Sequence, residues 1–203
     1  MTMIETERTI EGIARSTRLK DATRSAHDGI DRRIMACDPF SSRARYGLFL
    51  KLQHGFHRDI DALYREQSLA ALITDLRHRR RLGLIEDDLA DLRLQMPPYD
   101  ESAVFREDAA ADLPTALGWL YVAEGSNLGA AILLKQAARL KLSTTFGARH
   151  LAGSPQGRAR HWRSFVAALD SVVLSDGDEA GVVAGARSAF NRVSVLIHDI
   201  FAN

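Results

Sequence analysis

Apolar residues recur at intervals of three and four along nearly the whole chain, and this pattern most constrains the fold. The first such segment, residues 17–35, carries its apolar residues on one helix face: Leu19, Ala22, Ala26, Ile30 and Ile34. Alternating apolar and polar runs rich in β-branched residues, which mark strands, do not occur in the sequence. The chain is therefore predicted to be all-α.

Capping and turn residues divide the chain into about seven or eight predicted helices. Pro39 ends the first, and Ser41 or Ser42 provides an N-cap for a helix at residues 42–65. The later helices are predicted as two short ones within 69–94 broken near Gly83, a long one from Pro114 to about Leu142, and two more at 156–174 and 178–201. Loops are expected at 97–99 and 146–155.

Length and charge exclude several classes of protein. With 203 residues the chain is expected to form one domain, residues 16–203, after a flexible segment at 1–15. Lys plus Arg total 27 against 26 for Asp plus Glu, which argues against nucleic acid as the main partner. No apolar run approaches the ~20 residues of a membrane span, and the N-terminus lacks a secretory signal. The single cysteine, Cys37, fits a reducing cytoplasm.

Three glycines, Gly118, Gly125 and Gly129, interrupt the most apolar of the predicted helices. Each costs roughly 1 kcal/mol of helix stability relative to alanine. At about 100° per residue they fall within about 40° of one another and leave one helix face bare. This face either packs closely against another helix or forms a groove in which a ligand lies against the backbone, beside Ser126.

His27 lies at the border of the apolar face of the first helix and has two polar neighbours on that side. Asp31, one turn away, can accept a hydrogen bond from the second imidazole nitrogen and fix the tautomer that a metal-bound histidine needs. Lys20 lies about 10 Å along the same face, within reach of an anionic group on the edge of a macrocycle. An axial metal ligand and a plain surface histidine are both compatible with this pattern.

Two further clusters carry weaker signals. Gln53 and His57, one turn apart, either hold ordered water in a pocket or hydrogen-bond within their helix. The basic run from Arg77 to Arg81 is interpreted as a solvated helix end, with docking of a partner as the alternative. No H-E-x-x-H, C-x-x-C, P-loop or G-x-S-x-G motif is present in the sequence.

Three segments together closely resemble the bacterial haem oxygenases: residues 19–30 around His27, residues 121–131 (YVAEGSNLGAA) and residues 146–151 (FGARHL). The resemblance covers roughly residues 16–201, and the glycine motif is its specific part. It implies a multi-helical fold with haem between a proximal helix and a kinked, glycine-rich distal helix. Haem is then both cofactor and substrate, and O2 and external electrons convert it to biliverdin, carbon monoxide and ferrous iron.

The resemblance also implies roles for individual residues. His27 matches the proximal iron ligand, and Asp31 stands where the family usually has a glutamate behind that histidine. On the distal side the residues are Gly125, Gly129 and Ser126 in the oxygen pocket, and Gln53 with His57 ordering distal water. The helical spacing, rather than the resemblance, adds Gly118 to the bare cofactor-binding face.

The family divides over which meso carbon of haem is attacked, according to how the haem propionates are held. Lys20 and Tyr121 match the propionate partners of members that release α-biliverdin. Members with altered selectivity carry Asn and Phe at these two positions, and Lys at the positions of Met35 and Gln136. The resemblance therefore predicts the α isomer.

Partners follow from the same resemblance. Electrons must come from a ferredoxin or a flavin reductase, because the chain has no flavin or Fe–S motif, and Arg24, Arg32 and Arg33 near His27 are a candidate docking face. Bacterial members serve either iron recovery from haem or biliverdin supply to a bacteriophytochrome. The alternatives are a haem carrier or gas sensor on the same fold, which needs no glycine wall, and a helical interaction module that binds no cofactor.

Overall fold

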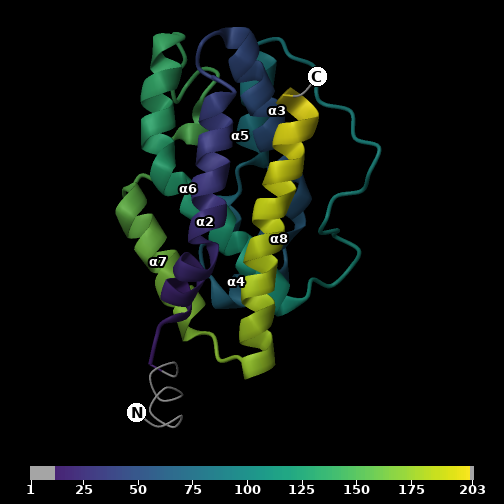
Figure 1. Ribbon diagram of the computed structural model, residues 1–203, viewed down its shortest axis with the longest axis vertical. Coiled ribbons are helices and arrows are strands. Elements are labelled where there is room, and N and C mark those ends of the chain that lie inside the picture. The colour runs from purple at the N-terminus through teal and green to yellow at the C-terminus, as the bar shows by residue number, and fades with distance from the viewer. Residues whose placement is uncertain (1–11, 202–203) are drawn as a thin grey trace.

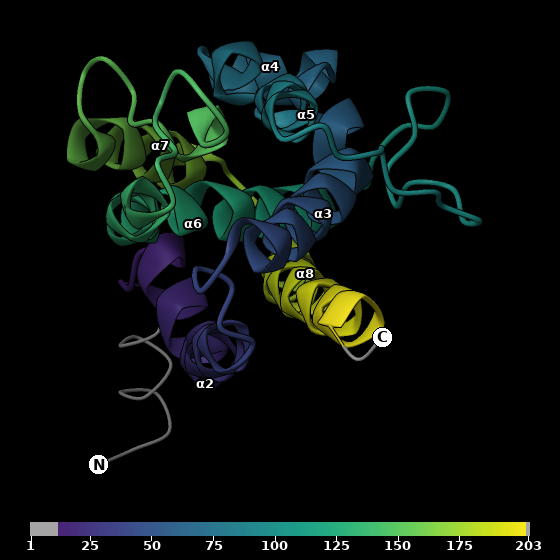
Figure 2. The ribbon, with the colours of Figure 1, turned by 90° about the horizontal axis from the view of Figure 1, so that it is seen from above.

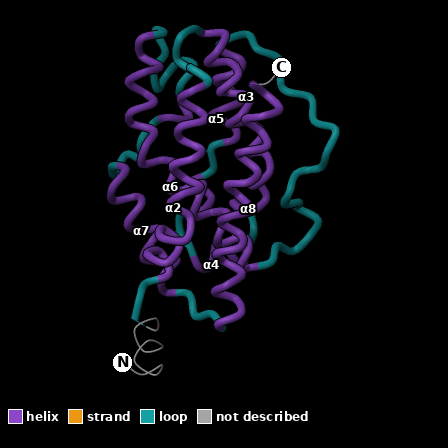
Figure 3. The backbone as a smooth tube through the Cα atoms, in the orientation of Figure 1, coloured by secondary structure: helices purple, strands orange, loops and turns teal. Residues whose placement is uncertain are grey.

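The computed structural model describes residues 12–201, which form a helical bundle without a named strand (Figures 1 and 3). Its α-helices are α2 (Arg15–Ala36), α3 (Arg43–Ile60), α4 (Gln67–Leu72), α5 (Leu82–Asp91), α6 (Leu113–Arg139), α7 (Arg158–Ser171) and α8 (Asp176–Phe201). The 3-10 helices are η1 (Asp61–Tyr64), η2 (Leu76–Arg79) and η3 (Arg149–Leu151). The all-α prediction is confirmed for the described residues.

Helix α8 is the helix that packs against most of the other long helices. It packs against α6, α2 and α3, while α3 also packs against α5, and α7 covers α6 (Figure 2). Trp119 of α6 stacks on Phe56 of α3 with ring centres 5.8 Å apart, and Phe105, from the long loop before α6, meets its edge at 5.4 Å. Burial of these aromatic rings supplies a large share of the apolar driving force for packing.

Helices α6 and α8 approach each other backbone to backbone. A Cβ atom placed on Gly118 would lie 2.2 Å from the carbonyl oxygen of Val182, and one on Gly185 would lie 2.5 Å from that of Thr115. Both positions exclude any side chain, so glycine is required for this crossing. The prediction that Gly118 continues a cofactor-binding face is therefore wrong, because α8 covers it.

Several predicted boundaries are confirmed. Ser42 caps α3 by accepting a hydrogen bond from the backbone N–H of Arg45, and Pro114 lies in the first turn of α6. The predicted break near Gly83 is wrong, since Gly83 lies inside the first turn of α5. The chain turns earlier, at residues 73–81, where η2 replaces the α-helix.

The predicted flexible segment, residues 1–15, lies outside the described residues up to residue 11. Its last residue, Arg15, begins α2 and is buried. The Arg15 guanidinium donates to the Glu179 carboxylate of α8 at 2.6 Å and to the Val172 carbonyl at 2.6 Å. The packed part of the chain therefore includes Arg15.

By length and composition, residues 113–138 of α6 would be able to cross a membrane. This differs from the expectation that no apolar run approaches that length. In the bundle the first half of the helix is buried against α8, and apolar side chains are exposed only in its second half, at Leu128 (43% exposed) and Ile132 (66%). The core helix of a soluble bundle can meet the same criteria of length and apolar composition. Burial in the core does not account for the exposed apolar side chains in the second half of α6.

Candidate haem site

His27 projects from α2 with 57% of its side chain exposed. Its Nδ1 atom lies 3.4 Å from an Asp31 oxygen and 3.9 Å from an Asp28 oxygen, and the ring of Phe190 on α8 meets it edge to face at 6.1 Å. Because both carboxylates lie nearest Nδ1, Nε2 is the nitrogen that would be available to bind a metal. The Asp31 distance is longer than a good hydrogen bond and leaves the pair loosely coupled.

The glycines in the second half of α6 lie in a different environment from Gly118. A Cβ on Gly129 would meet nothing within 4 Å, and one on Gly125 would meet only the Trp162 ring, at 3.7 Å. Ser126 donates from Oγ to the carbonyl of Ala123 at 2.7 Å, so its hydroxyl proton is already used within the helix. Of the two interpretations of the glycine face, packing holds for Gly118. The space beside Gly129 is open, Gly125 faces only the Trp162 ring, and a ligand groove at these two glycines stays a prediction.

Helices α2 and α6 overlap in Figure 1 but lie apart in Figure 2, and α2 packs against α8 and α7 (Figures 1 and 2). Lys20 is exposed on α2, and Tyr121 of α6 is half-buried. Burial raises the pKa of Tyr121, and the negative charges of Asp21 and Asp170 raise it further. Asp21 directly follows Lys20 in α2, so the Tyr121 phenol lies near the part of α2 that carries Lys20.

A buried ionic cluster lies behind the glycine face. Glu124 is 2% exposed and accepts a hydrogen bond from Tyr64 at 3.0 Å and one from Arg79 at 2.9 Å. Burial raises the pKa of Glu124, and these two partners oppose the increase. Burial also lowers the pKa of Arg79, but its bonds to Asp75 and Glu124 outweigh this effect and raise it.

The basic run from Arg77 to Arg81 differs from its prediction as a solvated helix end. Arg77 and His78 are exposed, whereas Arg79 is 2% exposed and Arg81 is 9% exposed. Arg80 forms an ion pair with Asp61. Arg79 is buried against the Glu124 carboxylate, and Arg81 donates to the His150 and Ala152 carbonyls, although its Nε atom has no partner among the described residues. A count of charges cannot reveal such burial.

His57 is buried on the inner side of α3, and its Nδ1 atom has no hydrogen-bond partner among the described residues. Burial lowers the pKa of His57 to about 3, and the nearby Arg81, His150 and His54 act in the same direction. The imidazole is therefore neutral at physiological pH. Gln53, one turn earlier, is half-buried. A buried, unsatisfied ring nitrogen is suited to an ordered water, which agrees with the interpretation that this pair holds water in a pocket.

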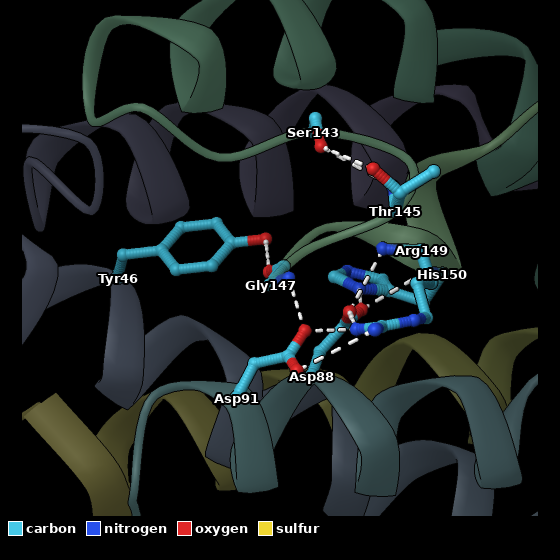
Figure 4. A network of polar contacts seen from close by, with 8 residues as sticks. All are labelled: Tyr46, Asp88, Asp91, Ser143, Thr145, Gly147, Arg149 and His150. Carbon is cyan, nitrogen blue, oxygen red and sulfur yellow. Dashed lines mark hydrogen bonds and ion pairs between the residues drawn. The ribbon is translucent and has the colours of Figure 1, made fainter.

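The FGARHL segment packs against α5 through Asp88 (Figure 4). The Asp88 carboxylate accepts hydrogen bonds from the backbone N–H groups of Arg149 at 2.9 Å and His150 at 3.0 Å, and lies 2.7 Å from Nδ1 of His150. In the same network Tyr46 donates to the Gly147 carbonyl at 2.9 Å. These bonds assign the Nδ1–H tautomer to His150 and leave its buried Nε2 facing the core without a partner among the described residues.

The family model described as "Heme oxygenase" matches residues 14–199. The chain belongs to the haem oxygenase family. Haem oxygenases are enzymes that cleave haem, and they bind it as both substrate and prosthetic group. "Heme oxygenase PigA" of Pseudomonas aeruginosa is 43% identical over 188 residues, which cover 93% of each chain.

Solved structures give the same fold. The haem oxygenase of Neisseria meningitidis, solved with NO and with CO bound, is 39% identical to this chain and superposes on it with a TM-score of 0.87. The superposition covers 94% of each chain. The haem oxygenase of Leptospira interrogans is 17% identical with a TM-score of 0.72, over 92% of this chain and 100% of that one, and supports the fold alone.

The residues of this haem oxygenase fit haem on three counts. His27 offers an exposed imidazole, Gly129 leaves a bare backbone that a Cβ would cover, and Ile132 adds an exposed apolar surface. A flat apolar ring with one axial ligand needs these three features. Two surface hollows, of about 350 and 300 Å³, lie elsewhere, around Arg15 and around Arg65.

Sequence reasoning missed four residues that shape this site. They are Phe190 beside His27, Trp162 beside Gly125, and the buried pair Glu124 and Arg79. Only Glu124 carried a usable signal, since a carboxylate inside an apolar helix next to a glycine needs a buried partner. The others are placed by tertiary contacts between helices far apart in the chain.

Proposed function

We propose that haem binds between α2 and the second half of α6, with His27 as its proximal ligand, and is cleaved to biliverdin, carbon monoxide and ferrous iron. Bound haem supplies the iron that activates O2 and the ring that is oxidised. The observation that carries the proposal is the helix face at Gly125 and Gly129, where a Cβ would meet at most the Trp162 ring, together with an exposed histidine on α2. A protein that only carries haem has no need of a bare helix face over the ring.

Each residue of the proposed site contributes through its own surroundings. Asp31 and Phe190 restrict the rotation of the His27 ring, so that Nε2 faces the ligand. His57, held neutral by burial, is suited to accept a hydrogen bond from distal water together with Gln53. Ser126 keeps acceptor lone pairs free while its proton bonds to the helix backbone.

The α-meso carbon is the proposed point of attack. The exposed Lys20 and the half-buried Tyr121, whose phenol lies near Asp21, would hold the haem propionates and so select one rotation of the ring. Met35 is exposed and Gln136 is half-buried, and neither side chain offers a cation for a second seating of the propionates.

An acidic electron donor, a ferredoxin or a flavin reductase, is proposed to dock near the exposed residues Arg24, Arg32 and Arg33. Arg24 forms an ion pair with Asp21 at 2.5 Å, and Arg33 donates to the Ser194 carbonyl at 3.2 Å. Because Arg24 and Arg33 already have partners within the protein, a charge-reversal substitution is best made first at Arg32. The proposed setting is the cytoplasm, in iron recovery or in biliverdin supply to a bacteriophytochrome, and neighbouring genes distinguish these roles.

One aerobic absorption time course tests the activity and its selectivity. Hemin is added to the purified protein until the Soret band saturates, and a reductant is then supplied in the presence of catalase. We expect the Soret band to decay into a broad red absorbance, and the extracted bilin to run as the α isomer. A stable oxy complex would indicate a carrier or sensor, and the absence of a Soret band would indicate an interaction module.

Selectivity is tested with Lys20→Ala combined with Tyr121→Phe. If these side chains seat the propionates, the variant still degrades haem but releases a mixture of isomers. An unchanged, purely α product from this variant would contradict the role of both residues, and a different isomer from the unmodified protein would contradict the α assignment.

A further inference from the structure

Glu124 directly precedes Gly125, yet it points away from the glycine face into the protein. At about 100° per residue it lies roughly 120° around the helix from the midpoint between Gly125 and Gly129. Its two carboxylate oxygens have separate partners, the Tyr64 hydroxyl at 3.0 Å and the Arg79 guanidinium at 2.9 Å. The carboxylate therefore ties α6 to η1 and η2 on the side remote from the proposed ligand.

Arg79 extends this connection to α7. Its side chain is fully buried, and besides Glu124 it donates to Asp75 at 2.8 Å, to the His161 carbonyl at 3.1 Å and to the Ser164 hydroxyl at 2.8 Å. The last two acceptors belong to α7. Since every nitrogen of the guanidinium is bonded, the relative positions of η2, α6 and α7 are closely determined.

Aromatic contacts return from α7 to the glycine face. The Arg79 guanidinium lies 5.6 Å from the centre of the Phe165 ring, and Phe165 stacks on Trp162 with ring centres 5.7 Å apart. Trp162 in turn lies 3.7 Å from the position of a Cβ on Gly125 and 5.6 Å from the Tyr121 ring. The buried ion pair and the wall beside Gly125 thus form one closed set of contacts.

A buried ion pair contributes little net stability, because desolvation of the charges offsets their attraction. It does impose a defined geometry, which apolar contacts alone do not, since apolar surfaces can slide past one another. At Gly125 and Gly129 themselves, α6 has no side chain with which to fix its position. The crossing with α8 at Gly118 holds the first half of the helix, and the contacts of Glu124 hold it from the opposite side next to Gly125.

We propose that Glu124 is a positioning residue, which holds α6 and Trp162 through Arg79 and Tyr64 so that Gly125 and Gly129 lie at a defined place over the haem edge. This inference rests on the proposed function, because it assigns the reacting face of the ligand to these glycines. It extends that proposal to the selectivity and rate of the reaction.

The test is Glu124→Gln, with Asp59→Asn as the matched control. Glutamine keeps the shape of the side chain and an acceptor for Arg79, which retains Asp75 as a counter-ion. Asp59 is also fully buried and accepts from Arg192 of α8 at 2.6 Å, but it lies on α3 and has no bond to α6. Both variants lose one buried charge, so general destabilisation affects them alike.

Four quantities are measured for each variant: the urea midpoint without haem, the dissociation constant for hemin, the pH profile of the ferric Soret band, and the rate and isomer ratio of bilin release. A misplacement of about 1 Å costs up to about 100-fold in rate. For Glu124→Gln we expect hemin affinity within about threefold of the unmodified protein, a shifted Soret pH profile, slower bilin release and a changed isomer ratio. For Asp59→Asn only the urea midpoint is expected to fall.

The proposal is overturned if Glu124→Gln keeps the Soret profile, rate and isomer ratio of the unmodified protein, or if Asp59→Asn changes them equally. If Glu124→Gln does not fold, Tyr64→Phe decides, since it removes only the hydroxyl that bonds to Glu124. It is expected to change the same readouts to a smaller extent, and no change would again overturn the proposal. Failure of the unmodified protein to bind or degrade hemin would instead refute the proposed function.

Discussion

We expect Gly118→Ala and Gly129→Ala to shift the free energy of unfolding in opposite directions, although both remove a glycine from the same face of α6. Each substitution gains about 1 kcal/mol of helix propensity. At Gly129 nothing opposes this gain, because the new methyl group meets no atom within 4 Å. Gly129→Ala is therefore expected to stabilise the haem-free protein by about 1 kcal/mol.

At Gly118 the new Cβ would lie 2.2 Å from the Val182 carbonyl oxygen and 2.5 Å from the Ala186 nitrogen. Both are backbone atoms of α8, so no side-chain rotation relieves the clash. The helices must separate by roughly 1 Å, at a cost near the upper end of overpacking, about 3 kcal/mol. After the gain in helix propensity, Gly118→Ala is expected to lose about 2 kcal/mol.

Urea unfolding of the haem-free proteins, followed by far-UV circular dichroism, measures this contrast. With a slope of about 2 kcal/mol per molar urea, the two midpoints should differ by about 1.5 M. Destabilisation by Gly129→Ala, or tolerance of Gly118→Ala, would refute the separation of packing and ligand faces. The same Gly129→Ala protein should degrade haem more slowly despite its greater stability, because its methyl group projects toward the ring. Unimpaired turnover would remove Gly129 from the proposed site.

Two further predictions concern histidines. We expect His27→Ala to lose the Soret spectrum of an imidazole-ligated haem and to recover it when imidazole is added, whereas an unchanged hemin titration would exclude His27 as the ligand. Burial lowers the pKa of His57 to about 3, so the unfolded chain, whose histidines titrate near about 6.5, binds the proton more readily. The stability that this residue contributes is therefore present above pH about 6.5 and is lost as the pH falls toward 3. His57→Gln should flatten the dependence of the urea midpoint on pH over that range, and equal slopes for the two proteins would assign the dependence to other groups.

Local rules recovered much of the architecture. The cap at Ser42, the proline in the first turn of α6 and the apolar faces of the long helices were all predicted, because helix formation and capping depend on residues a few positions apart. The break near Gly83 was wrong for the converse reason. A glycine marks flexibility, but the turn occurs earlier, at residues 73–81, where Arg79 and Arg81 point into the core.

The chain also singled out His27 and the glycine stretch without any structure, since an unusual residue in an otherwise regular helix is visible in the sequence. The sequence did not show which part of the structure lies next to each glycine. At Gly118 the neighbour is the backbone of α8, which carries its own close-packing glycine, Gly185, and at Gly129 it is open space. An ideal helix places these two α6 glycines on one face, and only the crossing point of α8 separates their roles.

The sequence by itself determined the helical class and the helix caps, because these follow from periodicity and from interactions within one or two turns. His27 became a candidate ligand through the resemblance to haem oxygenases. Tertiary structure alone decided which charges are buried. Arg79 was predicted to belong to a solvated helix end, and Glu124, 45 residues away in sequence, becomes its partner only when α6, η2 and α7 come together. Their burial depends on partners from three elements at once, and that is a property of packing that no local pattern encodes.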